Sequence, residues 1–300
     1  MTAFEQLGTE ARDAGGADLD LRSTLELVEL MSAEDATVPE AVAGALPAIA
    51  RLIDDIAERL ATGGRLVYAG AGTSGRLAAV DAVECQTTFS IPAGRVVALV
   101  AGSGAASAVE QEAAEDDATA GALEVQHLEV SSSDVVLGIS ASGRSPYVLG
   151  VLEAARSAGA LTGCIVNVER SELATLADHE VCVPVGAEIL AGSTRLKAAT
   201  AQKLVLNMIS TISMIRLGKT FGNLLVDLEA TNEKLRARVR SIVGHATGEP
   251  AERVDAALAA ANGNAKVAIV SLLTGLDPEA ARARLDRTGG IVRRALETTQ

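Results

Sequence analysis

The parts of this chain best suited to chemistry are two loops rich in glycine and serine. The first, residues 70–75 (GAGTSG), follows the short apolar run at 66–69 and precedes a predicted helix. Its glycines let the backbone turn sharply and bring N–H groups close to a ligand, and the positive end of the following helix favours an anion. This loop therefore predicts a site for a ligand that carries a phosphate. A tight strand-to-helix connection without a ligand is the alternative.

The same loop matches the dinucleotide fingerprint G-x-G-x-x-G through Gly70, Gly72 and Gly75, although that pattern alone is weak. A dinucleotide site also needs an acidic residue at the end of the second strand, where it holds the ribose. Here the second strand, RVVALVAGS, ends in Gly102 and Ser103. A nicotinamide cofactor is therefore disfavoured, and hydroxyls beside bare amides suit a phosphorylated small molecule better.

The second loop, residues 141–146 (ASGRSP), has the same setting. It follows the apolar run DVVLGIS, and Pro146 suits the first turn of a helix. The tripeptide Ser-Gly-Arg thus occurs at 74–76 and at 142–144, each time between an apolar strand and a helix. Two serine-lined loops at strand ends can converge on one phosphate. A chance repeat of the tripeptide is the alternative.

Carboxylates are the candidates for acid–base chemistry. Leu77, Val80 and Glu84 share one face of the helix after the first loop. A carboxyl group in an apolar setting has a raised pKa and can serve as a general acid, whereas a paired or snorkelling glutamate is the alternative. The helix predicted near 105–120 carries a run of acidic residues, and nothing in the pattern selects one of them: Glu110, Glu112, Glu115, Asp116 and Asp117.

Strands and helices alternate through the middle of the chain, which predicts a parallel sheet covered on both faces. The apolar runs predict strands near 66–69, 96–101, 134–140, 161–168 and 180–185, and helices near 75–85, 105–120, 145–158 and 171–177. Ligands of such sheets bind beyond the carboxyl ends of the strands. Both serine loops lie at that edge.

Helices flank this alternating region on both sides. Residues 1–22 predict an irregular arm. A first helix is predicted at 23–35, with Glu26 placed for a capping box on Ser23, and a second at 39–61. The segment from Thr194 to Leu217 predicts a long helix that is apolar on more than one face, either a core helix or a subunit interface. From Gly218 onward the pattern is all-helical, with helix ends predicted at glycines that include Gly244, Gly248 and Gly275.

Composition narrows the function classes. The net charge of −13 argues against a nucleic-acid partner. The sequence shows neither a signal peptide nor an apolar run long enough to span a membrane, so we expect neither secretion nor membrane insertion. The three cysteines are widely spaced and predict reduced thiols in a cytoplasmic protein. His127, His179 and His245 lack metal-ligand spacing, so no metal site is predicted.

Several long motifs in order resemble the N-acetylmuramic acid 6-phosphate etherases of the sugar isomerase (SIS) superfamily. They are YAGAGTSGRLAAVDAVEC, ISASGRSPYVLG, VGAEILAGSTRLKAATAQKLVLNM and KTFGNLLVDLEATNEKL. The resemblance implies a three-layer, flavodoxin-like α/β fold with a five-stranded parallel sheet. It also implies N-terminal helices at 1–51, an SIS domain at 52–218 and a helical region at 219–300, similar to ubiquitin-associated domains.

The resemblance further implies a homodimer without metal or organic cofactor. The expected reaction cleaves the D-lactyl ether of N-acetylmuramic acid 6-phosphate, in cell-wall recycling. Carried over by motif, Glu84 corresponds to the proton donor and Glu115 to the second active-site glutamate. The sugar-phosphate loops then comprise Thr73, Ser74, Gly75, Ser140, Ser142 and Ser145, with Ser193 also in the substrate site.

The sequence departs from the family pattern at several positions. Both glutamates remain, so we expect these departures to affect the fit of the substrate rather than the type of reaction. Val83 and Gln86 flank the proton donor, where Ser and Pro are usual, and Ala199 stands where Gly is usual. Two other functions share this architecture: a sugar-phosphate-binding regulator similar to glucokinase regulatory protein, and an aldose–ketose phosphosugar isomerase. Both glutamates favour the etherase.

Overall fold

The computed structural model describes residue 11, residues 18–228 and residues 232–297. The chain forms two compact units, which we call the α/β unit (Met1–Glu84 and Ala93–Ser210) and the helical unit (Cys85–Pro92 and Thr211–Gln300). Most of the N-terminal arm expected at 1–22 lies outside the described residues. The domain limits expected at 51/52 and 218/219 stay predictions.

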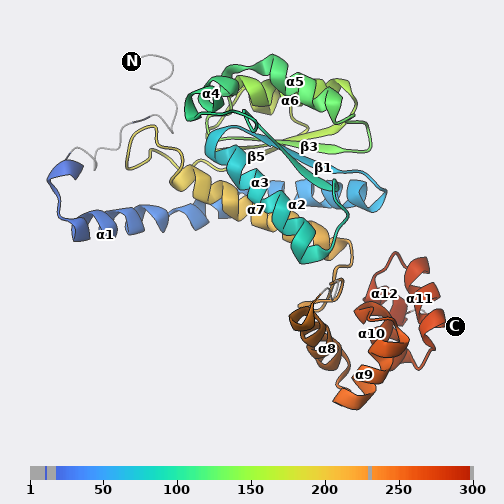
Figure 1. Cartoon of the computed structure of the whole chain (residues 1–300). Helices are drawn as coiled ribbons and strands as arrows, with labels where there is room; N and C mark the ends of the chain where they lie inside the picture. Colours follow the sequence, from blue (N-terminus) through green and yellow to red (C-terminus); the bar gives the residue numbers. More distant parts are fainter. Residues whose placement is uncertain (1–10, 12–17, 229–231, 298–300) are drawn as a thin grey trace. The chain divides into compact units, whose positions relative to one another are not determined.

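The α/β unit is built on a five-stranded parallel sheet with the order β2-β1-β3-β4-β5 (Figure 1). The strands are β1 (Leu66–Gly70), β2 (Val96–Val100), β3 (Val135–Ser140), β4 (Leu161–Val166) and β5 (His179–Cys182). This order is the flavodoxin-like one, in which the chain reverses direction across the sheet between β1 and β3. The predicted sheet is confirmed, and both serine loops follow strands that flank the switch point.

Helices cover both faces of the sheet, as the continuous apolar strands predict (Figure 1). Helices α5 (Ala118–His127) and α6 (Pro146–Ser157) lie on one face, and α2 (Val38–Ala61), α3 (Gly72–Phe89) and α7 (Lys197–Arg216) on the other. The sheet and α6 pack closely at Gly138 of β3, where an added Cβ would lie only 2.8 Å from the Val148 side chain of α6. The predicted three-layer sandwich is therefore confirmed.

The N-terminal helices form as predicted. Helix α1 (Thr24–Asp35) begins with a capping box, in which the Ser23 N–H donates to Glu26 at 2.8 Å. By length and composition, Thr24–Ala61 could span a membrane. Nevertheless, one face of α2 is buried within the unit, as in the core helix of a globular protein: Val38, Val42, Ala45, Ile49, Leu52, Ile53, Ile56, Ala57 and Leu60.

Two predicted helices differ from the structure. The helix predicted near 105–120 is broken into α4 (Ala108–Ala113), a 3-10 turn (Ala114–Asp116) and α5, because the Asp117 carboxylate accepts the Ala120 N–H at 2.9 Å and starts a new helix. The helix predicted at 171–177 is only a 3-10 turn, Leu173–Thr175. The first of these breaks places Glu115 in a turn rather than on a regular helix face.

The helical unit contains a short hairpin and five described helices around its own apolar core. The elements are β6 (Thr220–Phe221), β7 (Leu224–Leu225), α8 (Glu233–Thr247), α9 (Ala251–Ala260), α10 (Ala265–Thr274), α11 (Pro278–Arg287) and α12 (Val292–Glu297). Gly248 and Gly275 follow the last turns of α8 and α10 in the left-handed conformation, as expected of glycines predicted to end helices. Gly244, also predicted as a stop, lies inside α8.

Candidate functional site

The loop after β1 is a backbone turn of unusual tightness. A Cβ on Gly75 would lie 2.5 Å from the carbonyl oxygen of Gly70, and a Cβ on Gly70 would lie 2.7 Å from the Gly75 nitrogen. Only glycine fits at both positions. Helix α3 begins at Gly72, earlier than predicted, so Thr73 and Ser74 lie in its first turn, half-buried. Their N–H groups belong to the positive end of the helix, which favours an anion.

The loop after β3 is also fixed by its own backbone. Ser140 is 6% exposed, and its Oγ accepts the Gly143 N–H at 3.1 Å. Gly143 has φ of +64°, and a Cβ there would lie 2.3 Å from the Cβ of Ser171. Ser145 is buried and its Oγ donates to the Glu115 carbonyl at 3.4 Å. Ser140 and Ser145 thus shape the loop.

Thr73 and Ser142 differ from these structural serines. Both side chains are half-buried, and neither hydroxyl has a hydrogen-bond partner within the part of the chain that the structure describes. Because β1 and β3 are paired, with Gly70 opposite Ile139, the two loops lie at the same edge of the sheet. Their hydroxyls are therefore available to one ligand at that edge.

A chain of amide side chains connects the first loop to the rest of the sheet edge. The Ser74 Oγ donates to Gln202 of α7 at 2.8 Å, and Gln202 donates to Asn167, after β4, at 3.0 Å. Asn167 in turn donates to the Val183 carbonyl at 2.9 Å. The sequence analysis missed Gln202 and Asn167. A polar residue inside the apolar stretch TAQKLVLNM was the available signal.

Glu115 lies over the first loop. Its Oε2 is 3.8 Å from the position that a Cβ on Gly72 would occupy. Partial burial, and then the nearby Asp116 and Glu112 carboxylates, raise the pKa of Glu115. The structure therefore distinguishes this glutamate from the other acidic residues of its run, which the sequence pattern could not do.

Glu84 lies elsewhere on the same helix. It is 12 residues beyond Gly72, which corresponds to about 18 Å along the axis at ~1.5 Å per residue. Its side chain is 63% exposed, and its Oε2 is 3.8 Å from the Nζ of Lys203. The neighbouring Val80 and Val83 are 48% and 62% exposed.

In this single chain Glu84 therefore does not have the apolar setting, and the alternative of a paired glutamate on the helix surface describes it better. The residues that share its face are indeed apolar, but that face points away from the sheet, whereas Ala78, Ala82 and Cys85 are buried. Period-3.6 patterning shows which residues lie together, not which face a neighbour covers.

Ser193 precedes α7, and its backbone N–H donates to the Leu190 carbonyl at 2.9 Å. The nearby start of α7 is already occupied by a carboxylate of the protein. Glu188, which is fully buried, accepts the N–H groups of Lys197 and Ala198 at 3.0 and 2.9 Å. This helix end therefore has no room for a phosphate, in contrast to the start of α3.

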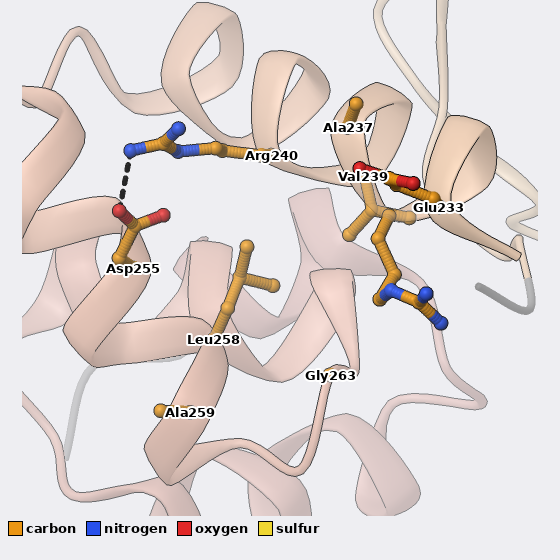
Figure 2. A pocket seen from close by; sticks show the side chains of 9 residues that line it. Glu233, Ala237, Val239, Arg240, Asp255, Leu258, Ala259 and Gly263 are labelled. Atoms are coloured by element: carbon orange, nitrogen blue, oxygen red, sulfur yellow. Dashed lines mark hydrogen bonds and ion pairs between the residues drawn. The ribbon is translucent and has the colours of Figure 1, made fainter.

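A cavity of about 460 Å³ lies in the helical unit, between α8 and α9 (Figure 2). Leu258 and Val239 line it, together with the ion pair that joins Arg240 to Asp255. None of the residues singled out in the sequence lines this cavity. Within the described ranges, no group of three His, Cys, Asp or Glu side chains is placed to hold a metal ion.

Comparison with known proteins gives matches over nearly the whole chain. Residues 48–156 match the glucokinase regulatory protein N-terminal SIS domain, and residues 118–212 match the SIS domain. N-acetylmuramic acid 6-phosphate etherase from Rubrobacter xylanophilus is 55% identical over 97% of this chain and 96% of its own length. The protein of that name from Streptomyces avermitilis is 53% identical over 98% of this chain and 94% of its own length. The one from Escherichia coli O9:H4 is 48% identical over 98% and 99%.

Solved structures resemble the α/β part of the chain. A phosphoheptose isomerase from Francisella tularensis has a TM-score of 0.51 at 20% identity, and covers 65% of this chain and all of its own (100%). A phosphoheptose isomerase from Neisseria gonorrhoeae has a TM-score of 0.50 at 17% identity, with 64% and 98% covered. At such identities the likeness concerns the fold alone.

Proposed function

The chain belongs to the N-acetylmuramic acid 6-phosphate etherase family, and on that premise we propose that it cleaves the D-lactyl ether of this sugar phosphate. The products are N-acetylglucosamine 6-phosphate and D-lactate, as required for cell-wall recycling. The chain is thus an enzyme that acts on a carbon–oxygen bond. Its likeness to etherase relatives over nearly the whole chain carries the proposal.

The 6-phosphate binds at the switch point between β1 and β3. The N–H groups of Thr73 and Ser74, at the start of α3, and the hydroxyls of Thr73 and Ser142 converge on that edge of the sheet. A helix start and neutral hydroxyls can hold a phosphate without a dedicated lysine. Ser193, in the segment before α7, completes the substrate site in this proposal.

The reaction needs an acid and a base. The sugar opens to an aldehyde at C1, which acidifies the proton on C2. A carboxylate removes that proton while an acid protonates the departing lactate oxygen at C3, and water then adds to the unsaturated aldehyde. Two carboxyl groups in different environments meet this requirement.

Glu84 is the proposed proton donor and Glu115 the proposed base at C2, both through family resemblance. Burial raises the pKa of the Glu115 carboxyl group, which makes its carboxylate a better proton acceptor, as a base at C2 must be. Since a base must be ionised, its contribution falls as the pH drops through that raised pKa. The Glu84 side chain is 63% exposed in the single chain, so its surroundings give no comparable support for its role as proton donor.

The decisive experiment is incubation with N-acetylmuramic acid 6-phosphate in heavy water, followed by lactate detection and NMR of the sugar. Glu84→Gln should lose lactate release but still exchange the C2 hydrogen, whereas Glu115→Gln should lose both. Glu153→Gln, at an exposed position on α6, is the matched control and should behave as the unmodified protein. The opposite pattern of exchange would reverse the two roles. Full lactate release by both variants would exclude the two-carboxylate mechanism.

A regulator that only binds sugar phosphates is the second candidate, because residues 48–156 match the SIS domain of glucokinase regulatory protein. Such a protein would bind the substrate but release no lactate. The same assay therefore separates the two functions.

A homodimer in the cytoplasm is the proposed working form. The apolar side chains Val205 and Ile209 of α7 are already buried within the chain, but Val80 and Val83 on α3 are exposed. A second copy would cover such a surface. The cysteines are free, as expected of reduced cytoplasmic thiols. A stable and active monomer in sedimentation experiments at low concentration would overturn the dimer.

A further inference from the structure

A carboxylate that the proposed chemistry does not use is buried beneath Glu84. The side chain of Asp81, one turn earlier on α3, is only 3% exposed. Its Oδ2 accepts the Tyr68 hydroxyl of β1 at 3.0 Å, and its Oδ1 accepts the Ser210 hydroxyl of α7 at 3.1 Å. Asp81 is therefore fixed by the sheet on one side and by a neighbouring helix on the other.

Lys203 of α7 joins this buried carboxylate to Glu84. Its Nζ lies 3.9 Å from the Oδ1 of Asp81 and 3.8 Å from the Oε2 of Glu84. The two carboxylates are at i and i+3 and lie on adjacent parts of the α3 surface. One ammonium group, 32% exposed, is thus shared between a buried carboxylate and a solvent-exposed one.

We propose that Lys203, anchored by Asp81, is a positioning residue that holds the Glu84 carboxyl group in its reactive orientation. This inference rests on the proposed function, because it assumes that Glu84 reacts with the sugar. Lys203 itself touches no reacting atom in this proposal.

The arrangement suits such a role because its rigid part lies in the core. The Glu84 side chain is 63% exposed, whereas Asp81 is buried and accepts two hydrogen bonds that fix its oxygens. Burial raises the pKa of Asp81; the Tyr68 and Ser210 hydrogen bonds and Lys203 act against this rise, and Glu84 adds to it. Lys203 thus relieves the repulsion between the two carboxylates while it restricts Glu84.

The test compares Lys203→Met, Lys203→Arg and Arg51→Met in the full-length protein. Lys203→Met should lower kcat by roughly ten- to a hundredfold, since a displacement of about 1 Å at a reacting group can cost on the order of a hundredfold. KM should not change, because Lys203 does not touch the substrate in this proposal. Lys203→Arg, which keeps the charge, should restore most of kcat. Arg51→Met removes a positive charge from the exposed side of α2 and should change neither parameter.

A second variant guards against a trivial loss of structure. Asp81→Asn keeps the size of the side chain but removes the charge that anchors Lys203, so it should lower kcat in the same direction with KM unchanged. Thermal unfolding of each variant shows whether the fold is intact. An unchanged kcat in a folded Lys203→Met variant would overturn the inference. If the unmodified protein releases no lactate, the proposed function itself fails.

Discussion

The ion-pair cluster of the helical unit should be a large contributor to its stability. Lys219 and Lys266 each bring Nζ to the same carboxylate oxygen of Asp227, at 2.7 and 2.9 Å. Burial opposes the ionised form of Asp227, but the two lysines outweigh it and lower its pKa. Asp227→Asn would leave both ammonium groups facing each other without a counter-charge.

The size of the effect follows from burial. Removing one partner of a buried ion pair costs about 3–5 kcal/mol. The Asp227 side chain is 31% exposed, while those of Lys219 and Lys266 are 17% and 11% exposed. Water can therefore solvate part of the site, and we expect a loss of about 2–3 kcal/mol in the free energy of unfolding. For a unit of this size, that loss lowers the melting temperature by on the order of 10–20 °C.

Urea and thermal unfolding followed by circular dichroism measure this loss. Lys266→Met is the matched control, because it replaces a buried ammonium by an apolar side chain and leaves Asp227 paired with Lys219. Because no charge is then left without a partner, its effect should be smaller than that of Asp227→Asn.

The pH dependence gives an independent check. A lowered pKa in the folded state means that the contribution of Asp227 is complete above the pKa of the unfolded chain, about 3.9. It is lost as the pH falls through the lower folded value. The difference between the unmodified protein and Asp227→Asn should therefore shrink below about pH 4. Equal stability of the two proteins at pH 7 would refute the reasoning.

Three other outcomes are expected. Ser142→Ala should weaken binding of the sugar phosphate by about 1.5–3 kcal/mol, measured by calorimetry with no change in unfolding, because its hydroxyl donates to a charged group. Gly143→Ala should lower the unfolding free energy by at least about 1–2 kcal/mol in urea, because the residue has positive φ and its Cβ would meet Ser171. Asp134→Asn should destabilise the α/β unit at pH 7 by a margin that shrinks as the pH falls below about 4, since burial raises the Asp134 pKa but hydrogen bonds from Arg65 outweigh it and lower the pKa.

The fold could be predicted because its signals are local and repeated. Apolar runs of strand length, separated by helical patterns, identify a parallel sheet. In the structure, successive side chains of β1 point to opposite faces of this sheet, and both faces are covered. Val67 and Ala69 belong to the core under α5 and α6, whereas the Tyr68 hydroxyl donates to Asp81 of α3 on the opposite face. Helix ends were less predictable, because a single side-chain hydrogen bond, such as that of Asp117, can break a helix.

The tight turn of the loop after β1 was predictable for a similar reason, since glycines at such spacing allow the backbone to turn back closely on itself. The mutual approach of Gly70 and Gly75 is what that spacing encodes. The supporting amides were not predictable, because Gln202 and Asn167 meet Ser74 only when three distant segments come together. The residue pattern along one helix or strand does not show which side chains from other segments will contact it in the folded chain.

Glu84 shows where this limit affects function. Helical spacing correctly groups it with Val80, yet the same spacing fits a buried face and an exposed one. The charge that reaches Glu84 comes from Lys203, more than a hundred residues later in the chain, and that lysine is placed by the buried Asp81. If Glu84 reacts with the sugar as proposed, the position of its carboxyl group therefore depends on a lysine that lies outside its own helix. Helical spacing within α3 cannot reveal such a partner, because α7 brings it there only in the folded chain.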